Sequence, residues 1–171
     1  MSNIYKAFEN KKAFIPFVTG GDPDLETTKN LLIAMEKAGA DLIEIGIPFS
    51  DPIAEGPVIQ EASQRALAAG CTTDKLFDMV KEARQRVKIP MVFMTYANVV
   101  FSYGTERFVK KAAEVGMDGL ILPDVPFEEQ ETNARKNNMA SVMNMFTNLA
   151  GETAGKNKTK LDEYFDLIEA Y

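Results

Sequence analysis

Three carboxylates lie close together in one stretch of the sequence, and their type suits acid–base chemistry. Glu44 stands inside a short apolar run, and Asp51 and Glu55 follow in a loop rich in proline and glycine. Because the side chains of a strand alternate between its two faces, Leu42, Glu44 and Gly46 share one face. Glu44 therefore occupies a position at which the pattern predicts an apolar side chain.

Two interpretations of Glu44 are open. An ionised carboxylate buried without partners is costly, so such a group either acquires a raised pKa, as a general acid or base does, or pairs with dedicated partners as a structural residue. The chain contains no histidine, which excludes Ser-His-Asp and Cys-His catalysis and zinc sites built on histidine. Acid–base chemistry then falls on carboxylates, tyrosine, lysine or the single cysteine, and this favours the catalytic interpretation.

Composition indicates an ordinary globular protein. Of the 171 residues, 46% are hydrophobic and 26% are charged, which is enough for one domain with its own core. The net charge of -6 disfavours nucleic acid as a partner. The single Cys71 excludes an internal disulfide, and the N-terminal residues lack the order of a secretion signal. No apolar run approaches the roughly 20 residues that span a bilayer, so we expect a cytoplasmic protein without membrane contact.

Strand and helix patterns alternate along the chain. Apolar runs bounded by turn residues predict strands over 14–19, 41–47, 91–96 and 119–122. Apolar residues at helical spacing predict helices over 23–39, 58–70, 73–88 and 105–115. Asp22 is the expected N-cap of the first helix, with Pro23 as its first residue.

A weak internal repeat supports this order of elements. The segment 38–41 before the second strand is matched by 115–118 before the fourth: in each, a helix end is followed by a glycine turn, an aspartate and an apolar strand. Repeated strand–helix units imply a parallel sheet, which closes as a barrel or as a doubly wound sheet. In this alignment Glu44 takes the place of Ile121, so the carboxylate is the departure from the repeat.

Both closures place a functional site at the carboxyl ends of the strands. The residues delivered there are Thr19 to Asp22, Glu44 with 50–57, Tyr96 to Asn98, and Asp124 with Pro126. No glycine-rich phosphate motif of the Walker or dinucleotide type is present. An aldolase with a Schiff-base lysine is a further alternative, but it needs a lysine inside a strand. Lys88 lies at a strand's edge, and Lys110 and Lys111 lie on a predicted helix.

Four segments of the sequence together resemble the alpha subunit of tryptophan synthase. They are 14–23 (FIPFVTGGDP), 44–57 (EIGIPFSDPIAEGP), 96–98 (YAN) and 123–126 (PDVP). The resemblance runs in unbroken order over about residues 4–130, and the segment PFSDP is its most specific part. No segment beyond Gln130 resembles this family.

The resemblance implies a (β/α)8 TIM-barrel fold and a lyase of tryptophan biosynthesis. Such an enzyme cleaves indole-3-glycerol phosphate to indole and glyceraldehyde 3-phosphate by a retro-aldol step. The alpha subunit needs no cofactor or metal, and it binds a beta subunit that carries pyridoxal phosphate. By position, Glu44 corresponds to the general acid/base of the family. Glu55 corresponds to the second carboxylate, commonly Asp, which holds the indole N–H.

The same resemblance assigns further residues to substrate and partner. Phe17, Tyr96 and Asp124 are assigned to substrate binding, although Phe17 and Tyr96 are equally compatible with a role as core aromatics. The loop Asp51-Pro52-Ile53 is expected to face the beta subunit.

Two amphipathic helices are predicted near 139–151 and 159–171. A complete barrel of this type has about 250 residues. We therefore expect the first four β/α units, a half-barrel over 1–130, and a helical tail over 131–171 that packs on it or is swapped with it. Open sheet edges would be covered by the tail or by a second copy, as a homodimer. The alternative function is a non-catalytic half-barrel that acts as a scaffold or beta-subunit-binding module.

Overall fold

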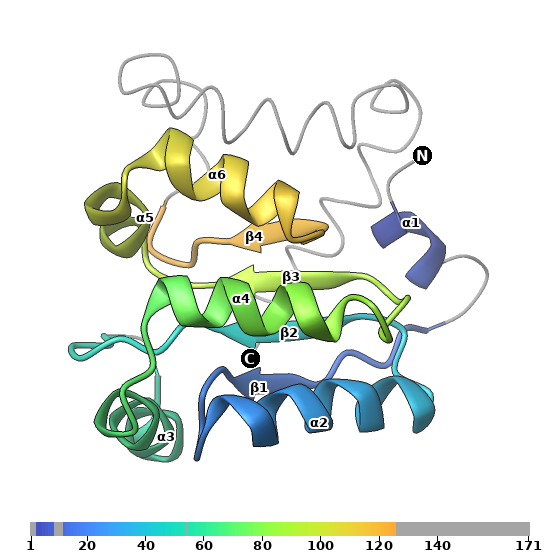
Figure 1. Cartoon of the computed structure of the whole chain (residues 1–171), viewed down its shortest axis with the longest axis horizontal. Helices are drawn as coiled ribbons and strands as arrows, with labels where there is room; N and C mark the ends of the chain where they lie inside the picture. Colours follow the sequence, from blue (N-terminus) through green and yellow to red (C-terminus); the bar gives the residue numbers. More distant parts are fainter. Residues whose placement is uncertain (1–2, 9–11, 54, 126–171) are drawn as a thin grey trace.

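The computed structural model of the chain describes residues 3–8, 12–53 and 55–125 (Figure 1). The predicted helices near 139–151 and 159–171, and the predicted boundary after residue 130, lie outside the described residues. Within the described ranges, no helix is both long and apolar enough to cross a membrane.

Four parallel strands form one sheet, and they lie side by side in chain order. They are β1 (Phe17–Thr19), β2 (Ile43–Gly46), β3 (Met91–Met94) and β4 (Gly119–Ile121). Each strand pairs with the next one in the sequence, so the order does not reverse as it does at the switch point of a doubly wound sheet. Of the two closures that the sequence allows, these strands therefore have the arrangement of a partial β/α barrel.

Helices connect the strands and cover one face of the sheet. Those that the sequence predicts are α2 (Leu25–Lys37), α3 (Pro57–Ala68), α4 (Thr73–Ala83) and α6 (Thr105–Glu114). Two short helices are not predicted: α1 (Asn3–Ala7) and α5 (Ala97–Tyr103). Figure 1 shows α2, α4 and α6 running across the same face of the sheet, with α3 and α5 near one end of it.

The larger core lies between the sheet and these helices. Ile43 and Ile45 of β2 point to this side and are fully buried. Phe77 of α4 contacts Phe93 of β3 and Phe108 of α6 edge to face, with ring centroids 5.5 and 5.2 Å apart. Edge-to-face aromatic contacts of this kind favour one relative orientation of the packed elements. The core therefore fixes the sheet against α4 and α6.

The opposite face of the sheet corresponds to the interior of a barrel. Leu42 packs there with Val92 and with Ala7 of α1 in a smaller apolar cluster. Glu44 follows two positions after Leu42, and its side chain is half-buried. The alternation predicted for this strand is confirmed, because Ile43 and Ile45 pack in the other core.

The two aspartates of the sequence repeat make equivalent contacts. Asp41 N donates to Phe14 O, and Asp41 Oδ2 accepts from Phe14 N, both at 2.9 Å. Asp118 N donates to Met91 O at 2.8 Å, and its Oδ2 accepts from Met91 N at 3.0 Å. Asp118 also pairs with Arg84 Nη2 at 2.6 Å. Each aspartate therefore joins the amino end of its own strand to that of the neighbouring strand.

The N-cap of the first long helix differs from the prediction. Asp24, not Asp22, is the cap: its Oδ1 accepts from Thr27 N at 2.7 Å, and α2 begins at Leu25. Asp22 instead binds Arg65 of α3, whose Nε and Nη2 donate at 2.8 and 2.9 Å. Both aspartates have the side chain of a good N-cap, so the sequence alone does not distinguish them. The prediction of Asp22 as the cap was wrong because its ion pair forms with a residue 43 positions away.

Candidate active site

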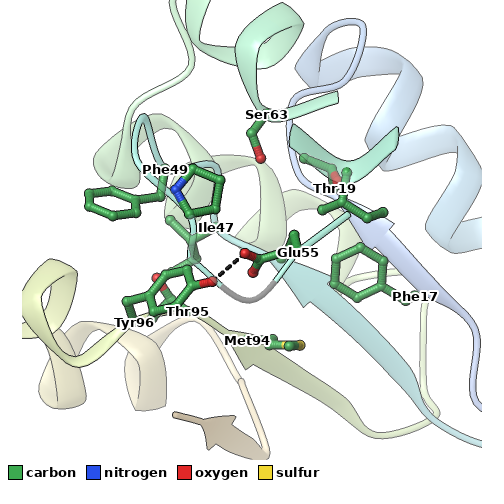
Figure 2. A pocket seen from close by; sticks show the side chains of 12 residues that line it. Phe17, Thr19, Ile47, Phe49, Glu55, Ser63, Met94, Thr95 and Tyr96 are labelled. Carbon is green, nitrogen blue, oxygen red and sulfur yellow. Dashed lines mark hydrogen bonds between the residues drawn. The ribbon is translucent and has the colours of Figure 1, made fainter. Parts of the chain in front are cut away.

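A small pocket lies at the carboxyl ends of the strands, where the sequence predicts a functional site (Figure 2). Most of the side chains that line it are apolar. The polar lining groups are one carboxylate, one phenol and three aliphatic hydroxyls. The lining residues are Phe17, Thr19, Gly46, Ile47, Phe49, Pro52, Glu55, Ile59, Ser63, Met94, Thr95 and Tyr96. Apolar pockets with a few polar groups are typical binding sites for small molecules.

Glu55 and Tyr96 meet in this pocket. The Tyr96 hydroxyl donates a hydrogen bond to Glu55 Oε2 and accepts one from the backbone N–H of Ile53 at 3.1 Å (Figure 2). The carbonyl oxygen of Glu55 accepts a further bond from Gln60 Nε2, in the first turn of α3, at 2.8 Å. The side chain and the backbone of Glu55 are therefore held from two different elements.

Phe17 lies against Gly46 of the neighbouring strand. A Cβ atom built on Gly46 would stand 2.6 Å from Phe17 Cζ, which is closer than such atoms approach in real structures. A glycine inside a strand often marks such a close approach. Gly46 thus leaves room for the Phe17 ring, and both residues line the pocket.

Glu44 lies beside Phe17, its register partner on β1. Burial raises the pKa of its carboxyl group above the ordinary value for glutamate. No described residue donates a hydrogen bond to this carboxylate or pairs with it, and this favours the acid–base interpretation over the structural one. Glu44 is not itself among the residues that line the pocket; Phe17, next to it, is.

Asp124 binds the backbone of a neighbouring helix. Its Oδ1 and Oδ2 both accept from the N–H of Ala97, at 3.0 and 3.1 Å. These bonds tie Asp124, the third residue after β4, to Ala97, the first residue of α5. Asp124 does not line the pocket, so its contact with substrate stays a prediction.

The loop between β2 and α3 has an outer and an inner side. Pro52 and Glu55 line the pocket, whereas the side chain of Ile53 is 83% exposed. Asp51 is exposed as well and accepts a bond from Ser50 Oγ at 2.5 Å. One loop therefore supplies a carboxylate to the pocket and presents an apolar side chain outward.

The lysines considered for Schiff-base chemistry lie elsewhere. Lys88 Nζ donates to Gln85 O at 3.0 Å, and Lys111 Nζ pairs with Asp74 at 2.6 Å. No lysine lines the pocket.

In the part of the chain that the structure describes, no three His, Cys, Asp or Glu side chains gather in a way that could hold a metal ion.

Four lining residues are not singled out by the sequence: Ile59, Ser63, Met94 and Thr95. Met94 shares the inner face of β3 with Val92, so strand alternation identifies it once the site is known. Ser63 enters from α3, one helical turn after Ile59, and shares a helix face with it. Thr95 directly follows β3 and precedes Tyr96, but its residue type alone does not indicate a role in the site.

Comparisons with known proteins agree with the four sequence motifs. The family model described as tryptophan synthase alpha chain matches residues 4–160, which extends past Gln130. The tryptophan synthase alpha chain of Alkaliphilus metalliredigens is 58% identical over 121 residues, which cover 71% of this chain and 46% of that protein. The alpha chain of Clostridium acetobutylicum is 56% identical over 124 residues, covering 72% and 47%.

Solved structures give the same result. Tryptophan synthase subunit alpha from Legionella pneumophila superposes with a TM-score of 0.75 at 39% identity, covering 87% of this chain and 56% of that one. A chain of the tryptophan synthase complex from Pyrococcus furiosus gives a TM-score of 0.67 at 38% identity, covering 82% and 52%. The chain thus spans about half the length of the relatives it matches.

Proposed function

This chain belongs to the tryptophan synthase alpha chain family, and from that membership we propose that its pocket binds indole-3-glycerol phosphate and cleaves it to indole and glyceraldehyde 3-phosphate. The observation that carries the proposal is the meeting of Glu55, Phe17 and Tyr96 in one largely apolar pocket. Such a pocket suits a flat aromatic ring with one N–H group. The reaction is a carbon–carbon lyase step of tryptophan biosynthesis and needs no cofactor.

In this proposal Glu55 binds the indole N–H. Protonation makes the bound ring cationic, and a fixed carboxylate next to the ring nitrogen lowers the energy of that cation. The bond from Tyr96 orients the carboxylate before the substrate arrives, so less reorganisation is needed during the reaction. Loss of such a group costs on the order of 100-fold or more in rate.

Glu44 acts as the acid and base of the retro-aldol step. It gives a proton to the ring carbon that carries the glycerol chain, and it takes a proton from the hydroxyl on the adjacent carbon. The carbon–carbon bond breaks, its electrons return to the ring, and the aldehyde carbonyl forms. The raised pKa of Glu44 supports this role, because a carboxyl group with a raised pKa keeps more of its proton-donating form near neutral pH, and its ionised form is a stronger base. Phe17 and Asp124 complete the proposed substrate site.

Release of indole from indole-3-glycerol phosphate tests this function. The purified chain is assayed with and without a tryptophan synthase beta subunit, and Glu44→Gln serves as the matched control. Turnover by the wild-type chain that disappears in the control supports the proposal. A folded wild-type protein that releases no indole under either condition contradicts it.

The proposed protein partner is the tryptophan synthase beta subunit, and Asp51, Pro52 and Ile53 form the proposed contact. Exposure of the apolar Ile53 side chain supports this choice. The same observation favours the second candidate function, a non-catalytic module that binds the beta subunit. Binding of the beta subunit without indole release would support that second function over the first.

A second copy of the chain is another proposed partner. Among the described residues, β1 pairs only with β2 and β4 only with β3, and open strand edges favour pairing with other chains. The proposal treats residues 1–130 as the β/α half and 131–171 as a tail packed on or swapped with it, in a cytoplasmic protein. Light scattering at several protein concentrations distinguishes a monomer from a dimer.

A further inference from the structure

Two buried hydroxyls in the pocket have no partner within the protein. In the part of the chain that the structure describes, Thr19 Oγ1 and Thr95 Oγ1 are the only buried side-chain nitrogen or oxygen atoms without a hydrogen bond. Thr19 is 6% exposed and Thr95 is 3% exposed, and both residues line the same pocket. Buried hydroxyls are normally bonded, since an unpaired one loses its hydration without compensation. Two exceptions at one pocket point to a ligand.

Thr28 shows how a buried threonine is satisfied elsewhere in the same protein. Its side chain is completely buried. Its Oγ1 accepts a hydrogen bond from Gly21 N at 2.9 Å and donates one to Asp24 O at 3.1 Å. The protein therefore satisfies a buried threonine hydroxyl where it serves the fold. The missing partners of Thr19 and Thr95 are a property of the pocket.

The two hydroxyls are placed around the proposed catalytic carboxylate. Thr19 ends β1, and Thr95 directly follows β3, so they flank the end of β2 from its two neighbours. In the view of Figure 2, Glu55 lies between Thr19 on one side and Thr95 on the other. Both oxygens are closed off from solvent, so a ligand reaches them only if the pocket widens as it enters.

We propose that the hydroxyls of Thr19 and Thr95 are positioning groups that hydrogen-bond the substrate beside Glu55. This inference rests on the proposed function, since it takes indole-3-glycerol phosphate as the ligand. The glycerol hydroxyls and the ring N–H, the latter shared with Glu55 in a three-centre bond, are the two sources of the hydrogen bonds. A threonine hydroxyl both donates and accepts, so it satisfies either group. Neither threonine transfers a proton in the reaction.

Binding of two ligands to matched variants tests the inference. Thr19→Val and Thr95→Val remove each hydroxyl at nearly constant shape, and Thr19→Ser and Thr95→Ser retain it. All are made in the Glu44→Gln background, so that the substrate is not consumed. Dissociation constants for indole and for indole-3-glycerol phosphate are measured by indole fluorescence, with which no tryptophan of the protein interferes because the chain contains none.

Each valine variant is expected to raise the dissociation constant about threefold to tenfold, and each serine variant to change it less than about twofold. A change for both ligands assigns the contact to the ring N–H, and a change for indole-3-glycerol phosphate alone assigns it to the glycerol chain.

Unchanged affinities of both valine variants overturn this inference but leave the proposed function in place. Absence of binding by the Glu44→Gln parent overturns it together with the proposed function. If only one of the two valine variants binds more weakly, the role belongs to that threonine, and the inference is overturned for the other.

Thermal stability provides a readout that does not depend on the ligand. Replacing an unpaired buried hydroxyl by a methyl group is neutral or stabilising, so Thr19→Val and Thr95→Val are expected to keep or raise Tm. Thr28→Val loses two hydrogen bonds and is expected to lower Tm. A fall in Tm for Thr19→Val and Thr95→Val as large as that for Thr28→Val would show that the hydroxyls serve the fold, and would overturn the inference.

Discussion

The hydroxyl of Tyr96 donates a hydrogen bond to the carboxylate of Glu55, and this one bond joins two separate β/α units. Tyr96 is the N-cap residue of α5, and Glu55 stands just before α3. The ring of Tyr96 also packs against Phe49, with centroids 5.6 Å apart. The ring of Tyr96 therefore packs against Phe49 while its hydroxyl binds Glu55, and a substitution that removes only the hydroxyl separates the two roles.

Tyr96→Phe keeps the ring and removes the donor to Glu55. We expect kcat/KM for cleavage of indole-3-glycerol phosphate to fall roughly tenfold or more, since hydrogen bonds to charged groups are among the stronger ones. Steady-state assay of indole release measures the change. Tyr103→Phe is the matched control, because Tyr103 donates to Asp74 at 2.5 Å away from the pocket. Equal activity of the two variants would show that the bond to Glu55 has no catalytic role.

Glu44→Gln is expected to change how stability depends on pH. Burial raises the pKa of Glu44 above the value of 4.5 that applies to the unfolded chain. The folded protein then binds this proton more tightly, so the free energy of unfolding falls as pH rises through the window between the unfolded and the folded pKa. Glutamine does not ionise, so the variant does not lose this part of the free energy of unfolding as pH rises. Denaturant unfolding is measured between about pH 4 and pH 8. The free energy of unfolding of the variant, relative to that of the wild type, should increase toward the upper end of this range. Identical pH profiles would contradict the prediction.

Gly46→Ala is expected to displace the Phe17 ring. The added Cβ would meet Phe17 Cζ at 2.6 Å, so the ring must move within the pocket, and indole affinity should fall about tenfold or more. Gly56→Ala adds the same methyl group with no atom within 4 Å and is expected to bind indole nearly as the wild type does. Fluorescence titration compares the two variants. Normal affinity of Gly46→Ala would mean that the ring position does not limit binding.

The aspartates of the repeat are expected to contribute unequally to stability. Asp118 accepts from Met91 N and pairs with Arg84 in a mostly buried position, whereas the bond from Phe14 N to Asp41 is exposed. Asp118→Ala should lower the free energy of unfolding by about 2–4 kcal/mol and Asp41→Ala by about 1 kcal/mol. Urea unfolding measures both. Equal losses would show that burial does not separate the two positions.

Ile53→Ser is expected to weaken binding of the beta subunit. The side chain is 83% exposed, so its replacement should leave the stability of this chain nearly unchanged while removing apolar area from the proposed contact. Val58→Ser is the matched control, because Val58 is 74% exposed on the first turn of α3. Affinity for the beta subunit is measured by calorimetry. Equal losses in the two variants would argue against a specific role for the loop 51–53.

The order of the elements, and the face of β2 that carries Glu44, can be predicted from the sequence. Four strands, four of the six described helices and the alternation along β2 follow from local periodicity, which backbone geometry fixes within a few residues. The motifs also identified Glu55, Phe17 and Tyr96, three residues of the pocket, and the repeat identified Asp41 and Asp118. The short helices α1 and α5 escaped prediction because a helix of five or seven residues shows too few turns to establish a period.

Which side chains contact one another depends on the three-dimensional arrangement of the elements. Tyr96 reaches Glu55 across 41 positions, Asp22 takes Arg65 as its partner instead of capping α2, and Asp124 binds the backbone of Ala97. The threonine at position 28 is satisfied by hydrogen bonds, and those at positions 19 and 95 are not. Such differences cannot be found in a sequence, because they depend on distances between residues far apart in the chain. Only the packing of whole strands and helices sets those distances.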